Sequence, residues 1–159
     1  MKIYLAGPLF TTGERDFNSQ LSKRLEERGH EVWLPQDSAQ ESMTPKQIFE
    51  EDVRGIDWAD VVVANMDGPD PDSGTCWECG YAYRKKLIVL FRTDFRVSHE
   101  VSVDLEVVMD RDKVPYNLML TESADAHLEL PFKAVDDVAM SIDRTLSNLS
   151  ITAKLSAQV

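Results

Sequence analysis

The segment Asp60–Asn65 constrains the fold most, because its centre is three consecutive valines followed by alanine. An uninterrupted, β-branched apolar run of this length is typical of a parallel strand covered on both faces. Similar short runs, stopped by turn residues, occur at Lys2–Ala6, Glu31–Leu34 and Leu87–Phe91, and we expect a fifth strand at Val114–Leu120. The sequence therefore predicts a buried, mostly parallel sheet.

Helix signals lie between these runs. Apolar residues recur at helical spacing in Glu14–Arg28, Pro45–Ile56 and Pro131–Leu149, and a further helix is expected from the Asp72 region to Lys86. Alternation of strands and helices with short connections predicts an α/β fold, an open five-stranded sheet with helices on both faces, formed by residues 1–159 as one domain. The last residues, 150–159, are expected to fray or to dock on another subunit.

Composition limits the class of protein. With 159 residues, 43% of them apolar, the chain has the size of one ordinary domain. A net charge of −11 and a single basic run, Arg84–Lys86, argue against a nucleic-acid partner. No segment has the pattern of a signal sequence or membrane span, and two cysteines so close together cannot form a disulfide framework. We therefore expect a cytoplasmic protein that acts on a small molecule.

The segment Asp67–Ala82 carries the clearest functional signal. In a parallel α/β sheet, ligands bind beyond the carboxyl ends of the strands, so this segment should meet Gly7–Phe10 and Arg92–Asp94 in one crevice. We expect Glu78 in the first turn of a helix, ionised and held in one orientation by the helix dipole, and Asp72 just ahead of it as a cap or proton donor. An ordinary helix start with a solvated acid would use the same residue types.

Two further side chains belong to the predicted crevice. Asp52 lies on the helix before the central strand, and Tyr4 on the first strand has a phenol that can hydrogen-bond a buried carboxylate. Glycosyl transfer with retention needs a carboxylate to attack the anomeric carbon and an acid to assist the leaving group. Tyr4 is equally suited to filling the core, and Asp52 to an exposed helix face.

At these positions the chain resembles the nucleoside 2-deoxyribosyltransferases. The resemblance covers roughly residues 2–120 and rests on Tyr4–Phe10 (YLAGPLF), Asp52–Ile56 (DVRGI), Asp72–Ala82 (DSGTCWECGYA) and Asn117. It implies a flavodoxin-like sheet and transfer of 2-deoxyribose between nucleobases through a covalent glycosyl-glutamate, without metal or organic cofactor. The partners it implies are nucleosides and nucleobases.

The resemblance also implies roles for individual residues. The nucleophile resembles Glu78, with Tyr4 to position it. The acid that protonates the base resembles Asp72, with Asp52 as its second partner. Asn117 resembles an asparagine that reaches into the neighbouring subunit's site, which implies a homo-oligomer with shared sites. The matching motifs also assign Gly7, Pro8, Phe10 and Gly74 to the substrate pocket.

Three other hypotheses remain open at this stage. A nucleoside 5′-monophosphate N-glycosidase would use the same glutamate and pass the sugar to water, with Arg15 and Arg92 as possible cations for the phosphate. The Cys76–Cys79 pair has the spacing of a thiol–disulfide site, although small buried thiols fit it as well. A non-catalytic nucleotide-binding module would not need Glu78.

Overall fold

The computed structural model describes residues 1–38, 42–95 and 116–156. Its five strands are β1 (Lys2–Ala6), β2 (Glu31–Trp33), β3 (Val61–Asn65), β4 (Leu87–Arg92) and β5 (Ala126–Glu129). They form one sheet in the order β2-β1-β3-β4-β5, and every neighbouring pair is parallel. This is the flavodoxin-like order, whose topological switch point lies between β1 and β3. The predicted α/β fold with a five-stranded parallel sheet is confirmed.

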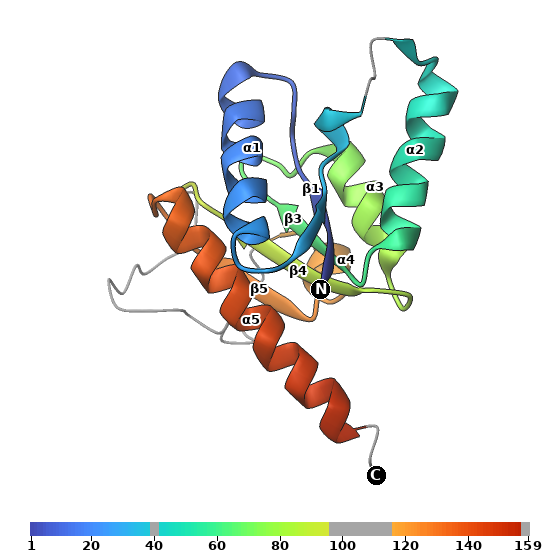
Figure 1. Cartoon of the computed structure of the whole chain (residues 1–159). Coiled ribbons are helices and arrows are strands. Elements are labelled where there is room, and N and C mark those ends of the chain that lie inside the picture. The colour runs from blue at the N-terminus through green and yellow to red at the C-terminus, as the bar shows by residue number, and fades with distance from the viewer. Residues whose placement is uncertain (39–41, 96–115, 157–159) are drawn as a thin grey trace.

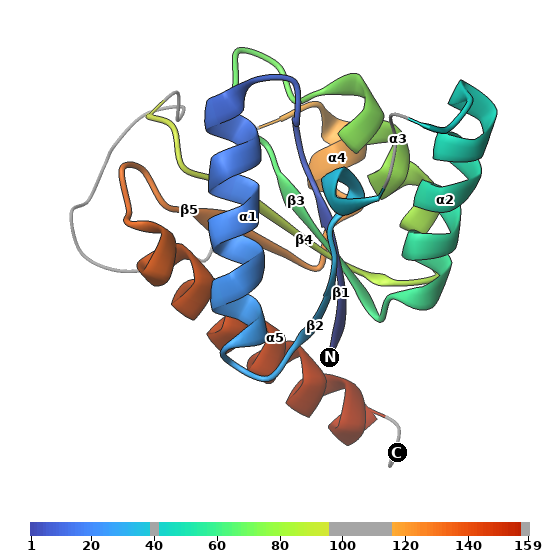
Figure 2. The ribbon, with the colours of Figure 1, turned by 45° about the horizontal axis from the view of Figure 1, so that its top comes forward.

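Helices cover both faces of the sheet. They are α1 (Thr12–Glu26), α2 (Pro45–Trp58), α3 (Ser73–Ala82), α4 (Leu118–Thr121) and α5 (Val135–Ser156), with a short 3-10 turn, η1, at Pro35–Asp37. α1 and α5 lie on one face, and α2, α3 and α4 lie on the other (Figures 1 and 2). None of the helices in the described part of the chain combines the length and the apolar character that crossing a membrane requires.

Each face of the sheet has its own apolar core. Under α1 and α5, leucines of α1 and apolar residues of α5 such as Ile142 pack against Ile3, Val61 and Val89. Under α2, α3 and α4, the alternate strand residues, Tyr4 among them, form a second core. The division follows the period of two along a strand, which sends successive side chains to opposite faces.

The fifth strand was predicted in the wrong place. Residues 114 and 115 of the expected Val114–Leu120 strand lie outside the described residues, and Leu118–Thr121 is the short helix α4, whose N-cap Asn117 accepts a hydrogen bond from the Met119 N–H at 3.0 Å. The actual β5 has the sequence Ala-His-Leu-Glu at the sheet edge. Its polar residues give it no apolar run, and therefore no strand signal in the sequence.

Of the helices, α3 and α5 differ most from the predicted limits. α3 ends at Ala82 rather than Lys86, and Arg84 adopts a left-handed conformation with φ of 63° just beyond it. A glycine usually supplies this conformation after a helix, so an arginine there gave no stop signal. α5 begins later than expected, at Val135, and continues to Ser156, into the segment expected to fray.

α2 rests directly on a tryptophan of β2. Gly55 of α2 is in contact with the Trp33 indole, and a Cβ added at Gly55 would lie 2.6 Å from the indole nitrogen. Trp58 of the same helix packs on the same indole, with ring centroids 5.8 Å apart. The indole therefore sets the separation of α2 from the sheet, because a residue with a Cβ at position 55 would displace it.

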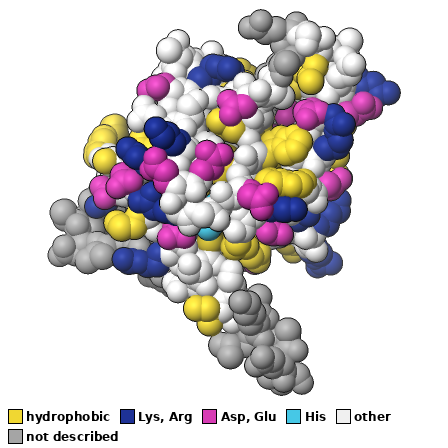
Figure 3. Space-filling model, viewed as in Figure 1, with side chains coloured by type: hydrophobic (Ala, Val, Ile, Leu, Met, Phe, Trp, Pro, Cys, Tyr) yellow, Lys and Arg dark blue, Asp and Glu magenta, His cyan; other side chains and the backbone are white. Residues whose placement is uncertain are grey.

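Charges on the surface are mixed. On the face seen in Figure 3, acidic and basic side chains are interspersed over the helices. Arg24, for example, pairs with Glu27 and Asp136, and Arg28 also contacts Asp136. This face therefore presents no continuous basic surface of the kind that phosphate backbones bind.

Candidate active site

A hydrogen bond between β1 and α3 organises the site. The Tyr4 hydroxyl donates to Oε1 of Glu78 at 2.6 Å, across 74 positions of sequence. Tyr4 is fully buried at the centre of the sheet, and burial together with the neighbouring Glu78 and Asp52 carboxylates raises the pKa of its phenol. Tyr4 therefore stays protonated and holds the Glu78 carboxylate in a fixed position.

Glu78 differs from its predicted state. It lies six positions after the N-cap Asp72, in the second turn of α3, so it does not receive the first-turn dipole effect expected for it. Burial raises its pKa to about 7; the Tyr4 bond lowers the pKa, and the Asp52 and Asp72 carboxylates raise it. Near neutral pH the carboxyl is therefore poised between its protonated and ionised forms, rather than permanently ionised.

Asp52 approaches Tyr4 and Glu78 from α2. Burial raises its pKa to about 6, and its Oδ1 atom is buried without a hydrogen-bond partner among the described residues. Its charge raises the pKa values of both Tyr4 and Glu78, which shows that the three groups lie close together. The exposed-acid interpretation of Asp52 is therefore wrong.

Asp72 is the N-cap of α3. Its Oδ2 accepts hydrogen bonds from the Thr75 N–H at 3.0 Å and from the Thr75 hydroxyl at 3.2 Å. A Cβ at Gly74 would lie 3.0 Å from the same oxygen, so the glycine leaves room for this cap. The structure thus gives both residues a role in starting the helix, beside the substrate roles expected for them.

The loop after β1 lies at the switch point of the sheet. Gly7 packs against Asn65, the last residue of β3, and a Cβ there would lie 3.1 Å from the Asn65 Cβ. The Pro8 carbonyl accepts from the Asn18 side chain at 3.0 Å. Phe10 is 75% exposed, so within one chain no side chain covers the aromatic ring assigned to the pocket.

The loops after β3 and β4 are joined to each other. Asp67 accepts hydrogen bonds from the Thr93 N–H at 2.6 Å, from the Thr93 hydroxyl at 2.6 Å and from the Asp94 N–H at 2.9 Å. The Gly68 N–H donates back to Asp94 at 2.8 Å. The loops after β3 and β4 therefore meet at the carboxyl edge of the sheet, as expected for two of the three strand-end loops.

The two arginines considered as phosphate cations differ, because Arg92 is buried and Arg15 is exposed. Arg92 is 4% exposed, donates to the Met66 carbonyl through Nε and Nη2, and lies over the Tyr116 ring. Arg15 donates to the Gln36 carbonyl at 3.4 Å. Burial of Arg92 removes it as a phosphate ligand.

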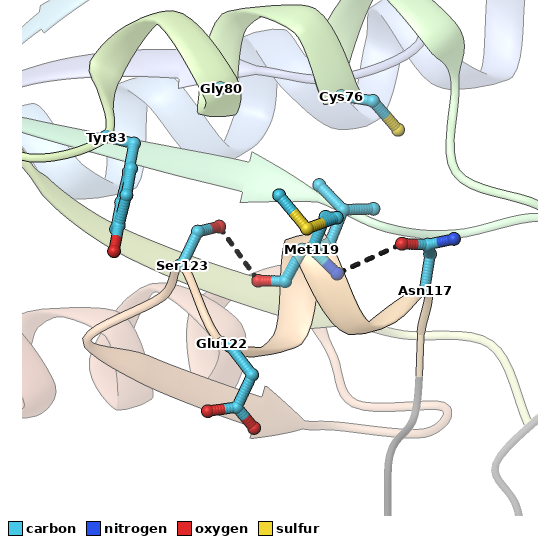
Figure 4. Close-up of a pocket in the computed structure, with 8 residues that line it drawn as sticks. Cys76, Gly80, Tyr83, Asn117, Met119, Glu122 and Ser123 are labelled. Carbon is cyan, nitrogen blue, oxygen red and sulfur yellow. Dashed lines mark hydrogen bonds between the residues drawn. The ribbon is translucent and has the colours of Figure 1, made fainter.

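Asn117 lies apart from the Tyr4–Glu78 pair. With Met119 it lines a cavity of about 640 Å³ between α3 and α4, where Cys76 and Gly80 supply the opposite wall (Figure 4). Helical geometry puts Glu78 about 200° around α3 from Cys76, on the other side of that helix. Within one chain, Asn117 therefore does not join Glu78.

The cysteines do not have the properties of a redox pair. Both are free thiols; Cys79 is fully buried, and burial raises its pKa to about 12. The pKa of Cys76 is raised as well, by partial burial and by Asp72. A reactive pair needs a lowered thiol pKa, so the shifts contradict the thiol–disulfide hypothesis. The described residues also contain no cluster of His, Cys, Asp and Glu able to hold a metal ion.

A polar network beneath the first loop was not predicted. Asn18 and Gln36 are buried, hydrogen-bond each other at 3.3 Å, and link the Pro8 carbonyl to η1. Gln36 also donates to the Arg15 carbonyl and to Ser19. Amide side chains are usually exposed, so nothing in the sequence distinguished these two from surface residues.

Comparison with known proteins agrees with this geometry. The family model described as nucleoside 2-deoxyribosyltransferase matches residues 3–119, which include both partners of the Tyr4–Glu78 bond and the loops that follow β1, β3 and β4. The chain belongs to the nucleoside 2-deoxyribosyltransferase family. The predicted resemblance is thereby confirmed.

Solved structures show the same fold as this family member. A 2-deoxyribosyltransferase from Bacillus psychrosaccharolyticus is 28% identical, with a TM-score of 0.61 over 87% of this chain and 90% of the other. A CMP N-glycosidase from Clostridium botulinum is 21% identical, with a TM-score of 0.59 over 91% of this chain and 99% of the other. At that identity the second likeness concerns the fold alone.

A curated relative carries a hydrolase name. The protein from Thermofilum pendens named 2′-deoxynucleoside 5′-phosphate N-hydrolase 1 is 36% identical over 77 residues, 43% of this chain. The matched part spans about half, 52%, of that relative. Family membership thus leaves two activities open, transfer of the sugar to a base and its hydrolysis.

Proposed function

We propose that the protein transfers 2-deoxyribose between nucleobases, with Glu78 as the nucleophile. The observation that carries this proposal is the 2.6 Å bond from Tyr4 to Oε1 of Glu78. Among the described residues Oε1 is the only oxygen of Glu78 with a hydrogen-bond partner, which leaves Oε2 for attack on the sugar. A carboxylate fixed through one oxygen and available through the other is the arrangement that covalent glycosyl catalysis needs.

The reaction is a double displacement. Ionised Glu78 attacks the anomeric carbon as the bond from that carbon to the base nitrogen breaks, and the electron pair of that bond goes to the departing base. The base takes up a proton and leaves. An acceptor base then attacks the same carbon through nitrogen, its N–H proton passes to the carboxylate that protonated the first base, and the Glu78 carboxylate is released unchanged. The configuration at the anomeric carbon is retained after two inversions.

Asp52 and Asp72 supply the proton and the base contacts in this proposal. Asp52 has a pKa of about 6 and a buried Oδ1 with no described partner, so its protonated form can donate to a leaving base. Asp72 uses Oδ2 to cap α3, which leaves Oδ1 for the base. Gly7, Pro8, Phe10 and Gly74 form the rest of the pocket wall in this proposal.

We further propose that the active form is a homo-oligomer. Asn117, Leu118 and Met119 start the short helix α4, and all three are exposed, Leu118 by 59% and Met119 by 79%. Asn117 lies on the far side of α3 from Glu78, so it can serve a site only in a neighbouring subunit. Its amide would then contact the sugar, as the family resemblance implies.

Hydrolysis of a deoxynucleoside 5′-monophosphate is the second candidate, favoured by the name of the Thermofilum pendens relative. Deoxyinosine incubated with free adenine separates the two activities. Deoxyadenosine supports transfer, whereas release of free sugar without deoxyadenosine would contradict it. Cleavage of the phosphorylated donor alone would identify the second candidate.

The covalent step has its own test. A 2-fluorinated donor slows breakdown of a glycosyl-enzyme, so mass spectrometry of the mixture should find the pentose on Glu78. An adduct on another residue would refute the assignment of the nucleophile.

A further inference from the structure

Helices α2 and α3 lie side by side and are joined by two side-chain contacts (Figures 1 and 2). The rings of Phe49 on α2 and Trp77 on α3 have centroids 5.2 Å apart. One turn further along α3, the Tyr81 hydroxyl donates to the carboxylate of Asp57 on α2, at 3.1 Å from Oδ1 and 3.3 Å from Oδ2. Trp77 and Tyr81 also stack on each other, with centroids 5.3 Å apart. These four side chains are called the α2–α3 bridge below.

The aromatic pair of the α2–α3 bridge is not part of the apolar core. Phe49 is 51% exposed and Trp77 is 46% exposed, and neither belongs to the cluster of buried residues under α2, α3 and α4. A ring left half exposed contributes little to an apolar core. The main structural effect of this pair is therefore to join the two helices.

The α2–α3 bridge lies beside the two carboxyls that the proposed function needs. Asp52 stands between the two bridge residues of α2, and Glu78 stands between Trp77 and Tyr81 of α3. Helical geometry places Trp77 and Tyr81 about 100° and about 60° around α3 from Glu78, both in the same direction. Each helix therefore carries its carboxyl between the two side chains that join it to the other helix.

The charged and titratable groups that act on Glu78 come from three elements. They are Tyr4 on β1, Asp52 on α2 and Asp72 at the start of α3. Tyr4 belongs to the sheet and Asp72 to the same helix as Glu78, whereas Asp52 is carried by a separate helix. The separation between Asp52 and Glu78 therefore depends on how α2 is held against α3.

We propose that the α2–α3 bridge is a positioning device for the reaction, which holds the Asp52 carboxyl beside Glu78 so that one acid serves the departing base while the other bonds to the sugar. Phe49, Trp77 and Tyr81 act through these two carboxyls rather than on the substrate. An aromatic pair has a preferred ring separation and angle, so it fixes the spacing of two helices. This inference rests on the proposed function, because that function makes Asp52 the proton donor and Glu78 the nucleophile.

The test compares the pH dependence of kcat/KM for deoxyinosine, with adenine as acceptor, in wild type, Phe49→Ala and Trp77→Ala. A reaction that needs protonated Asp52 and ionised Glu78 gives a bell-shaped curve. Loss of either ring should let α2 move away from α3, so we expect kcat/KM to fall about tenfold or more. The curve should also move to lower pH by about one unit, because burial is the main cause of both raised pKa values.

Three further variants separate the contact from the individual rings. Phe49→Ala combined with Trp77→Ala should be within about twofold of the worse single variant, because both changes remove the same contact. Trp77→Phe keeps a ring on α3 and should stay within about threefold of wild type. Phe132 is an exposed aromatic that stacks on Phe95 at 5.7 Å, outside α2 and α3, so Phe132→Ala is the matched control and should leave the curve unchanged.

A curve that stays in place in both alanine variants overturns the inference, whatever the loss of rate, because poorer folding lowers the curve without moving it. Activity that returns at higher protein concentration overturns it as well, since this would identify the exposed rings as a contact between copies of the chain. If the alanine variants do not fold, Phe49→Leu keeps an apolar side chain but lacks the ring, and the same movement of the curve is expected of it.

A measurement without turnover separates failure of this inference from failure of the proposed function. Carbon-13 NMR of protein labelled at the glutamate carboxyl carbons follows the titration of Glu78, and the spectrum of Glu78→Gln assigns its signal. We expect this titration to move to lower pH by about one unit in Trp77→Ala. If it moves while wild-type protein transfers no sugar, the role of the α2–α3 bridge in placing Asp52 beside Glu78 stands and the transferase proposal fails. If transfer is intact and the titration stays in place, the proposal about the bridge fails alone.

Discussion

The two faces of the sheet are built from the same strands and have opposite characters. The buried hydrophobic cluster under α1 and α5 consists of aliphatic residues and one phenylalanine. The core under α2 and α3 contains Tyr4, and the partly buried carboxyls of Asp52 and Glu78 lie beside it with raised pKa values. Burial stabilises the first face, whereas on the second it changes proton affinities. Successive residues of a strand point to opposite faces of the sheet. The same strands therefore build one face that stabilises the fold and one face that carries the ionisable groups.

The largest expected effect is loss of catalysis in Glu78→Gln. We expect kcat to fall about 10⁴-fold or more, because the amide cannot form the glycosyl ester. The rate of deoxyadenosine formation from deoxyinosine and adenine measures it. Activity within tenfold of wild type would refute the nucleophile.

The same variant should be more stable than wild type at alkaline pH. The pKa of Glu78 is raised in the folded protein, so its ionisation destabilises the fold as pH rises from about 4.5 through 7. We expect Glu78→Gln to raise the free energy of unfolding by about 2 kcal/mol at pH 8, and to change it little at pH 4. Urea titrations at the two pH values test this sign.

A substitution in the core under α1 and α5 should change the free energy of unfolding and leave kcat unchanged. Ile142→Ala on α5 removes a fully buried side chain, and we expect the free energy of unfolding to fall by about 3 kcal/mol. The kcat of the remaining folded protein should stay near wild type, because the helix lies across the sheet from Glu78. A large loss of kcat at unchanged stability would show that the faces are not independent.

Asp52→Asn should change the pH profile of transfer. With pKa values of about 6 for Asp52 and about 7 for Glu78, we expect a bell-shaped kcat/KM with its optimum between pH 6 and 7. The variant should lose about 10²-fold in rate and keep only a rise with pH, because Glu78 must still ionise. A bell-shaped dependence of kcat/KM on pH that is unchanged in the variant would show that Asp52 is not the proton donor.

Tyr4→Phe should have the smallest effect of the four. The ring volume is kept and one hydrogen bond is lost, so we expect about a tenfold loss in kcat at neutral pH. Because the Tyr4 bond lowers the pKa of Glu78, its loss should move the acid limb of the profile to higher pH. Recovery of activity relative to wild type at the same pH, as pH rises past 8, would distinguish this shift from damage to the core, which no change of pH would reverse.

The sequence predicted the apolar parts of this molecule better than its polar contacts. The limits of β1 and β4 follow from uninterrupted apolar runs, and they match the structure to within one residue. β5 gave no such run because His127 and Glu129 interrupt it. The strand-end argument and the family motifs together placed Tyr4, Asp52 and Glu78 in one predicted site.

The protonation state of Glu78 was beyond sequence analysis. The spacing from Asp72 suggested an ionised first-turn acid, but the pKa depends on burial between α2, α3 and the sheet, which only packing determines. Neither the burial of a side chain nor a network such as Asn18–Gln36 has a local signature in the sequence. The capping box Thr11–Glu14 did have one, a threonine followed three residues later by glutamate.

The contact of Gly55 with Trp33 sets the distance between α2 and the sheet. Asp52 lies one helical turn before Gly55 on the same helix, so the Trp33 indole helps to set the distance of its carboxyl from the sheet. A smaller aromatic side chain at position 33 would allow α2 to move closer to β2. In the proposed function, this movement would narrow the space for a nucleobase. Under the proposed function, residue 33 is therefore a position at which the choice of base can be altered without a change to the reacting groups.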